Sequence, residues 1–145
     1  MILVSFALAG PAADALRMRD AVSCDVLGPA TVALRDELLQ LAEQGDGLPW
    51  VSIRAAGCLV TRFSGDPSIV DHLAAWAVDP ERVGLTLVVL DHAHLLATGD
   101  ALRVATAAMT LADPRWHARF ADRLQRSELP ELRAMVGVDA PEAPQ

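Results

Sequence analysis

The chain has 145 residues, a formal net charge of −7 and a hydrophobic fraction of 52%. This length is enough for one domain with its own core, without metals or disulfides. Its apolar runs are shorter than the roughly 18 residues that a membrane helix needs, and its negative charge opposes contact with nucleic acid. We therefore predict a protein that binds neither a membrane nor nucleic acid.

Lysine, asparagine and tyrosine are missing from the sequence. Their codons are rich in A and T, so their absence indicates a GC-rich genome and predicts a bacterial source. The chain starts without the basic segment of a secretion signal. Its two cysteines, Cys24 and Cys58, form no C-x-x-C motif and are too few for a disulfide scaffold. We therefore expect buried free thiols in a reducing cytoplasm.

The first 45 residues alternate between strand and helix patterns. A run that is apolar on both faces predicts a central strand, and leucines at helical spacing predict an amphipathic helix. Leu34, Leu38 and Leu41 have this spacing, and Gly45 stands where a glycine often ends a helix. The expected elements are a strand over 2–8, a helix over 11–22, a short strand over 23–28 and a helix over 29–45.

Residues 48–63, LPWVSIRAAGCLVTRF, fit two structures. The β-branched and aromatic residues favour a strand, and Gly57 would then mark a bulge or a hairpin turn. A helix is the alternative, because Ile53, Ala56 and Val60 share one helical face. The sequence leaves both open, and an antiparallel pair of strands around Gly57 would make the fold α+β.

Asp-Pro occurs three times after residue 63, and each pair predicts the start of a helix. The Asp side chain accepts hydrogen bonds from free N–H groups of the first turn, and proline fits the next position because no N–H is needed there. Helices should therefore begin near residues 67, 80 and 114. Further helices are expected from Thr98 or Asp100 to about Ala112 and between Ser127 and Gly137, followed by a flexible tail over 138–145.

The segment VGLTLVVLD, residues 83–91, has the best strand pattern in the chain, because it is a short apolar run rich in β-branched residues. Strands that alternate with helices predict βαβ units. We expect a three-layer α/β fold, in which a mostly parallel sheet of four or five strands carries a C-terminal helical extension. One domain should span 1–137.

Asp91, His92 and His94 directly follow this strand. Ligands bind at the carboxyl ends of strands in open α/β sheets, so these side chains would lie at a binding edge. The His-x-His spacing places two imidazoles on one side of an extended chain, where they suit a divalent metal such as zinc. We predict His92 and His94 as metal ligands or catalytic bases, with Asp91 as a third ligand or an orienting carboxylate. Alternatively, Asp91 caps a turn and both histidines lie on the surface.

The loop that contains Ser64, Gly65 and Ser68 follows the preceding predicted strand. If the two strands are neighbours, this loop lines the same crevice, and N–H groups at the start of the next helix are predicted to bind a small anion. A nucleotide is not expected. The run that ends in Asp91 resembles the Walker B strand of P-loop ATPases, but a Walker A motif needs a lysine, which the chain lacks.

One segment in the last third combines several arginines with two aromatic residues. Arginine and tryptophan are frequent in protein–protein hot spots, so we predict an interface formed by Arg115, Trp116, Arg119, Phe120 and Arg123. Excess positive charge in an acidic chain favours self-association or an acidic partner. The alternative is an amphipathic helix that covers the core with a solvated charged face.

These patterns favour a small binding or regulatory protein that acts through protein–protein contacts, with a homodimer as one form. The main alternative is a small metal-dependent enzyme that uses Asp91, His92 and His94 at the edge of the sheet. The sequence leaves open whether the chain catalyses a reaction, and a divalent metal is the cofactor that its pattern suggests.

Overall fold

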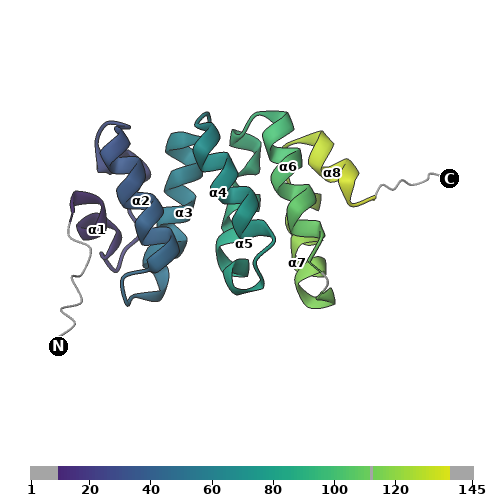
Figure 1. Ribbon diagram of the computed structural model, residues 1–145, viewed down its shortest axis with the longest axis horizontal. Helices are drawn as coiled ribbons and strands as arrows, with labels where there is room; N and C mark the ends of the chain where they lie inside the picture. Colours follow the sequence, from purple (N-terminus) through teal and green to yellow (C-terminus); the bar gives the residue numbers. More distant parts are fainter. Residues whose placement is uncertain (1–9, 112, 138–145) are drawn as a thin grey trace. The chain divides into compact units, whose positions relative to one another are not determined.

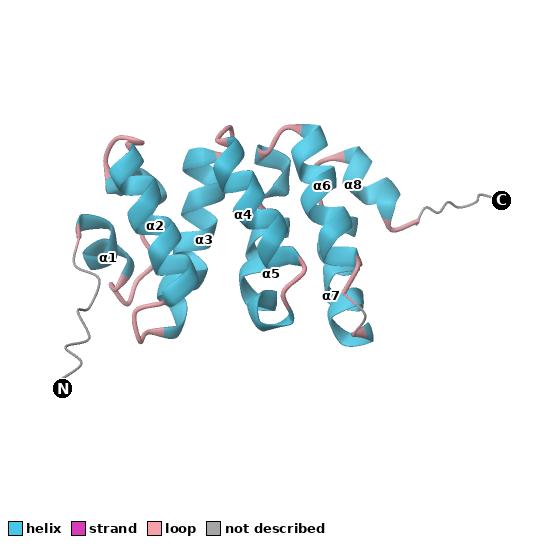
Figure 2. Ribbon diagram, viewed as in Figure 1, coloured by secondary structure: helices cyan, strands magenta, loops and turns pink. Residues whose placement is uncertain are grey.

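The computed structural model describes residues 10–111 and 113–137, and it is built from helices joined by turns. No strand occurs in the described residues (Figure 2). This finding corrects the predicted α/β fold with its mostly parallel sheet, and it also overturns the α+β alternative. The strand expected over 2–8 and the flexible tail expected over 138–145 lie outside the described residues.

The chain divides into two compact units, Met1–Phe63 and Ser64–Gln145. In the first unit, α2 and α3 pack against each other over most of their length, and α1 packs against both (Figure 1). The elements of this unit are α1 (Pro11–Leu16), the 3-10 turn η1 (Cys24–Leu27), α2 (Val32–Gln44) and α3 (Pro49–Phe63). The expected helix over 11–22 is therefore shorter, and the expected strand over 23–28 is a 3-10 turn.

Helix α2 has the form that the sequence predicts. Leu34, Leu38 and Leu41 are buried, and they lie on the side of α2 that packs in the core of the unit. Gly45 ends the helix with a φ of 72°, a left-handed backbone conformation that glycine adopts without steric cost.

Residues 49–63 form a helix, so the helical alternative for this segment is confirmed. Ala56 and Val60 are fully buried, while Ile53 and Phe63 are half-buried. Gly57 lies in the middle of α3 and is buried. It therefore marks neither a bulge nor a hairpin turn.

The two cysteines are joined in a disulfide that links η1 to α3. The Cα atoms of Cys24 and Cys58 lie 5.4 Å apart, and the two residues are 34 positions apart in the sequence. This bond corrects the prediction of two free thiols. The prediction failed because cysteine number and spacing do not reveal which segments the fold brings together.

The second unit contains two helical hairpins that stack side by side. Helix α4 is followed by α5, and α6 by α7; α4 packs against α6, and α5 packs against α7 (Figure 1). Helix α8 contacts both α6 and α7. The elements are α4 (Pro67–Ala77), η2 (Pro80–Arg82), α5 (Val83–Asp91), η3 (Ala93–Leu95), α6 (Thr98–Met109), α7 (Pro114–Gln125) and α8 (Pro130–Met135).

Helix α5 replaces the best predicted strand of the chain. Six of its nine residues are buried, because α4 and α7 both pack against it. A helix that neighbours cover on several sides needs no polar stripe, so its sequence reads as a continuous apolar run. Periodicity alone does not distinguish such a helix from a buried strand.

The three Asp-Pro pairs begin helices as predicted. Helix α4 starts at Pro67, η2 at Pro80 and α7 at Pro114. In each case the preceding Asp carboxylate accepts a hydrogen bond from the backbone N–H two residues later, at distances of 2.9, 2.9 and 3.0 Å. Helix α6 differs from the prediction because no side chain caps its first turn.

Within the described part of the chain, no helix is long and apolar enough to cross a membrane. The prediction of one domain over 1–137 concerns independent folding, and it stays a prediction.

Candidate functional site

The predicted cluster of Asp91, His92 and His94 lies at the end of a helix. Asp91 is the last residue of α5, and His94 belongs to η3. The Nδ1 atom of His92 lies 2.9 Å from the carbonyl oxygen of Val88, one turn back in α5. The His92 ring thus contacts the backbone of its own helix. The three side chains do not form the common cluster expected at the edge of a sheet.

The expected metal centre is not formed. Among residues 10–111 and 113–137, no three His, Cys, Asp or Glu side chains come together as a group that could hold a metal ion. The His-x-His spacing was informative only for an extended chain, in which alternate side chains share a face. In the structure the chain turns from α5 into η3 at these residues, and the two histidines have separate partners, the Val88 carbonyl oxygen for His92 and Glu128 for His94.

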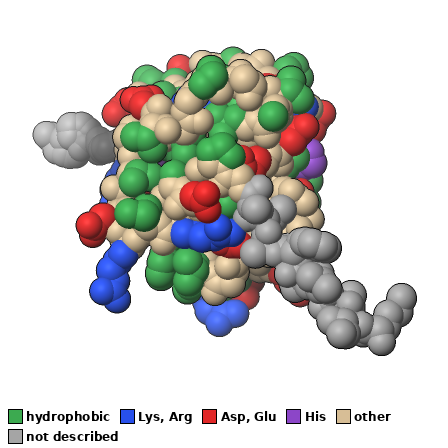
Figure 3. Space-filling model, turned by 90° about the vertical axis from the view of Figure 1, so that its left-hand side faces the viewer, with side chains coloured by type: hydrophobic (Ala, Val, Ile, Leu, Met, Phe, Trp, Pro, Cys, Tyr) green, Lys and Arg blue, Asp and Glu red, His purple; other side chains and the backbone are tan. Residues whose placement is uncertain are grey.

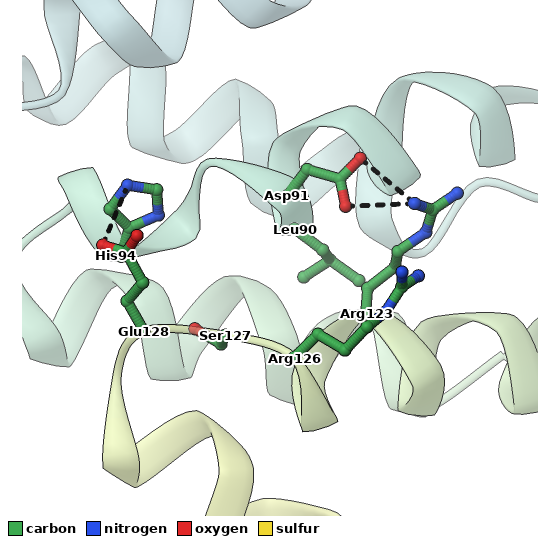
Figure 4. Close-up of a pocket in the computed structure, with 7 residues that line it drawn as sticks. All are labelled: Leu90, Asp91, His94, Arg123, Arg126, Ser127 and Glu128. Carbon is green, nitrogen blue, oxygen red and sulfur yellow. Dashed lines mark hydrogen bonds and ion pairs between the residues drawn. The ribbon is translucent and has the colours of Figure 1, made fainter.

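A small polar pocket lies beside this turn (Figure 4). Its volume is about 160 Å³. Side chains from α5, η3, α7 and the connection to α8 line it: Leu90, Asp91, His94, Arg123, Arg126, Ser127 and Glu128. It brings together Asp91 and His94, which were predicted as a catalytic pair, with Arg123, which was predicted as an interface residue.

Two pairs of acidic and basic side chains line the pocket, one on each side. Nη1 of Arg123 donates to the Asp91 carboxylate at 3.2 Å, and Nε2 of His94 lies 3.6 Å from an Oε2 atom of Glu128. Figure 4 shows these pairs on opposite sides of the pocket. Because the lining holds two carboxylates, Asp91 and Glu128, and two guanidinium groups, Arg123 and Arg126, the pocket has little excess charge with which to attract an ion. The contacts join the end of α5 to α7 and to the start of the following connection.

The predicted anion loop serves as a helix cap. Ser68 is exposed, and its backbone N–H and its hydroxyl both donate to Oδ1 of Asp66 at 2.9 Å. The N–H that was predicted to bind an anion is therefore already paired. Ser64 is half-buried and Gly65 is exposed, and neither lines the pocket that contains Asp91 and His94.

Helix α7 presents the predicted interface residues in two directions. Phe120 is fully buried, as is Leu124 one turn later. Trp116 is half-buried, and Arg115 and Arg119 are exposed beside it. The guanidinium carbon of Arg115 lies 5.5 Å from the centre of the Trp116 ring, and that of Arg119 lies 5.3 Å from it. Both distances are within the range of cation–π attraction.

Most of the positive charge on α7 is already paired within the second unit. Arg115 binds Asp113, Arg123 binds Asp91 and Arg126 binds Asp122. The hydrogen bonds from the Arg115 side chain and backbone hold the pKa of Asp113 below its usual value. Among the described residues, no ion pair involves Arg119. The local charge excess that the sequence suggested is therefore concentrated at Arg119.

Two groups of residues in the structure were not predicted from the sequence. Ser127 and Glu128 line the pocket, but no local pattern connects them to Asp91, some 36 residues earlier. Arg54 and Arg62 bind backbone carbonyls between α1 and α2. Their spacing of one helical turn on either side of Cys58 carries a signal, but only once the segment is known to be helical.

Comparisons of the chain with protein-family models, with curated proteins and with solved structures give no match.

Proposed function

We propose that the protein is a small binding or regulatory protein that contacts other proteins through the exposed side of α7, with a homodimer as one form of that contact. The surface consists of Trp116 and the two arginines beside it, Arg115 and Arg119, and we call it the Trp116 surface. The observation that carries the proposal is a half-buried tryptophan ring with two exposed guanidinium groups within cation–π distance of it.

The Trp116 surface has the chemistry of a binding hot spot. Tryptophan and arginine dominate the energy of many protein interfaces. The cation–π contacts restrict the Trp116 ring and both guanidinium groups before any partner arrives, which lowers the entropy cost of ordering them on binding. Arg119 supplies a charge that no carboxylate of the described residues neutralises, so a carboxylate of the partner is its expected counterpart.

Two residues predicted for the interface have other roles in the proposal. Phe120 belongs to the core rather than to the surface, since it is fully buried one turn after Trp116 on α7. Arg123 is half-buried and holds Asp91. Charge reversal at Arg123 would therefore disturb the fold of the second unit as well as any contact, so the test below uses Arg119.

Self-association is tested by sedimentation velocity at low salt (about 50 mM) and high salt (about 500 mM), where exposed charges are screened. We expect a dimer of the wild type at low salt. Trp116→Ala should weaken it by about 30-fold or more, the effect of losing a hot-spot side chain. Arg119→Glu should weaken it mainly at low salt. Arg19→Glu makes the same charge change at an exposed position of the first unit and serves as the control.

A wild type that is monomeric in both buffers would exclude the homodimer. Contact with a different protein is then tested with a photo-crosslinking residue at His117, which is exposed beside Trp116, and with the same residue at Arg19 as the control position. Cross-linking of one defined protein from His117, and its loss on Trp116→Ala, is the expected result. The same cross-links from both positions would contradict the proposal.

The cytoplasmic location is also proposed rather than observed. In the cytoplasm, disulfides are usually transient or redox-sensing. A cytoplasmic location therefore implies that the Cys24–Cys58 disulfide is of this kind. Rapid alkylation of thiols in intact cells, followed by mass measurement, tests the oxidation state of this pair in its native compartment.

A further inference from the structure

The connection between α1 and α2, residues 17–31, has few core contacts of its own. We call this connection the strap. Its regular structure is the short turn η1. Leu27 is its one buried residue, and most of its other side chains are exposed, including Met18 and Val26 at 59% and 62%. A segment with so little buried apolar surface depends on other attachments for its position.

A stripe along α3 supplies those attachments. Arg54, Cys58 and Arg62 are spaced by four residues, so they lie one above the other on a single face of the helix. Arg54 donates to the carbonyl oxygens of Leu16, Met18 and Arg19 at 3.2, 2.5 and 3.1 Å. Arg62 donates to the carbonyl oxygen of Cys24 at 2.7 Å and also to that of Gly28. The disulfide lies between these two sets of hydrogen bonds.

The disulfide is the strongest of the three attachments. Hydrogen bonds to exposed carbonyl groups exchange with hydrogen bonds to water at little net cost, and three of the five that the arginines make are exposed. The disulfide is covalent and is not weakened by water. Without it, the strap would be held by Leu27, by the ion pair of its first residue, Arg17, with Asp46, and by contacts that water can replace.

We propose that the strap is a redox-controlled cover of α3: reduction of Cys24–Cys58 by a dithiol releases it, and reoxidation returns it. Cys24 is half-buried and Cys58 is only 2% exposed, so the dithiol attacks the sulfur of Cys24. The thiolate of Cys58 leaves and takes up a proton. The second thiol of the reductant then attacks the mixed disulfide and frees Cys24. Two electrons pass to the protein, and the dithiol becomes a cyclic disulfide.

Release of the strap uncovers the thiol of Cys58 and the face of α3 around it. Helices α2 and α3 remain in contact, because their packing does not pass through the strap. Hydrophobic side chains are visible on one face of the molecule (Figure 3), and Met18, Val26 and Val32 are exposed in the first unit. The released form would add apolar surface there, and it would offer Cys58 as a site for mixed disulfides. This inference is independent of the Trp116 surface.

The test measures the alkylation rate of Cys58 in the full-length protein. The oxidised protein should show no reactive thiol, and its mass should rise by two hydrogen atoms after treatment with dithiothreitol. In the reduced protein, Cys58 should react with iodoacetamide within about tenfold of the rate of Cys24, the rate of an exposed thiol. Circular dichroism should show the same helix content in both forms. Cys24→Ser, which lacks the disulfide, should expose Cys58 with or without the dithiol.

Three results would overturn the proposal. If Cys58 reacts at least about a hundredfold more slowly than Cys24, the strap stays bound after reduction. If helix content falls on reduction, the disulfide holds the whole unit together rather than the strap. If the protein prepared without reductant contains two free thiols, the bond does not form. Cys24→Ser separates the first two results, because it can be tested without any reductant.

Discussion

At the scale of single residues, Thr86 is the clearest departure from ordinary packing. Its side chain is 1% exposed in the middle of α5. Within the described residues, its hydroxyl oxygen has no hydrogen-bond partner. A buried hydroxyl without a partner has lost its bonds to water and gained none in return, which costs about 1–3 kcal/mol. The rest of α5 around it is apolar.

We therefore expect Thr86→Val to stabilise the protein by about 1 kcal/mol, since valine fills nearly the same volume without a hydroxyl. Thr86→Ala is the matched comparison, because it removes the hydroxyl but leaves a small cavity, and it should be less stable than Thr86→Val. Urea unfolding followed by circular dichroism measures both. A Thr86→Val protein less stable than the wild type would show that the hydroxyl has a partner.

Residue patterns predicted part of the candidate site. Asp91, His94 and Arg123 were each singled out, and all three line one pocket. Their roles were not predictable, because the sequence suggested a strand where the chain forms a helix and a turn. The His-x-His motif has its chemical meaning only in an extended backbone. The contact between Asp91 and Arg123 joins different helices, and no local spacing reveals it.

At the scale of elements, helix starts were predictable and buried segments were not. The Asp-Pro pairs located three starts because capping is a local interaction between a side chain and the next turn. The prediction for α3 was ambiguous and the prediction for α5 was wrong, because tertiary packing decides the structure of both segments. Both are rich in β-branched residues, and α5 has no polar side. Packing partners outside the segment, α4 and α7 for α5, supply the information that the segment itself lacks.

The cap of α4 offers a test at this scale. Asp66→Ala removes the acceptor for the Ser68 N–H and hydroxyl, and it should lower the free energy of unfolding by about 1 kcal/mol. Asp66→Asn keeps a side-chain oxygen at the same place and should retain most of the stability. Thermal unfolding of the two variants provides the comparison. Equal losses in both would mean that the carboxylate charge, rather than the cap, stabilises the helix start.

At the scale of the whole molecule, each unit contains a carboxylate that is held in its charged form. In the first unit, the Arg17 side chain donates to Asp46 and lowers the pKa of that carboxyl. In the second, Arg115 lowers the pKa of Asp113. A lowered folded-state pKa stabilises the folded chain above the ordinary Asp value, and the stabilisation disappears as the pH falls through the lowered pKa.

Acid should therefore weaken both units. We expect Asp46→Asn and Asp113→Asn each to unfold at a lower urea concentration than the wild type at pH about 7, where both wild-type carboxylates are charged. The difference should shrink as the pH falls below the ordinary Asp pKa and through the lowered pKa of each carboxyl, because the wild-type carboxylates then take up protons. Urea titrations at several pH values test this. A difference that stays constant across the series would show that the variants disturb packing instead of charge.

The stacked hairpins of the second unit have a consequence for how the chain can change in length. Helix α8 lies against both α6 and α7, with Leu132 completely enclosed, so it closes the side of the stack that a third hairpin would otherwise occupy. An extra pair of helices inserted between α7 and α8 would leave the existing pairings of α4 with α6 and of α5 with α7 intact, and α8 could still terminate the series. This unit can therefore be extended by whole hairpins. The loss of α8 alone would instead expose the surface of α6 and α7 that α8 covers.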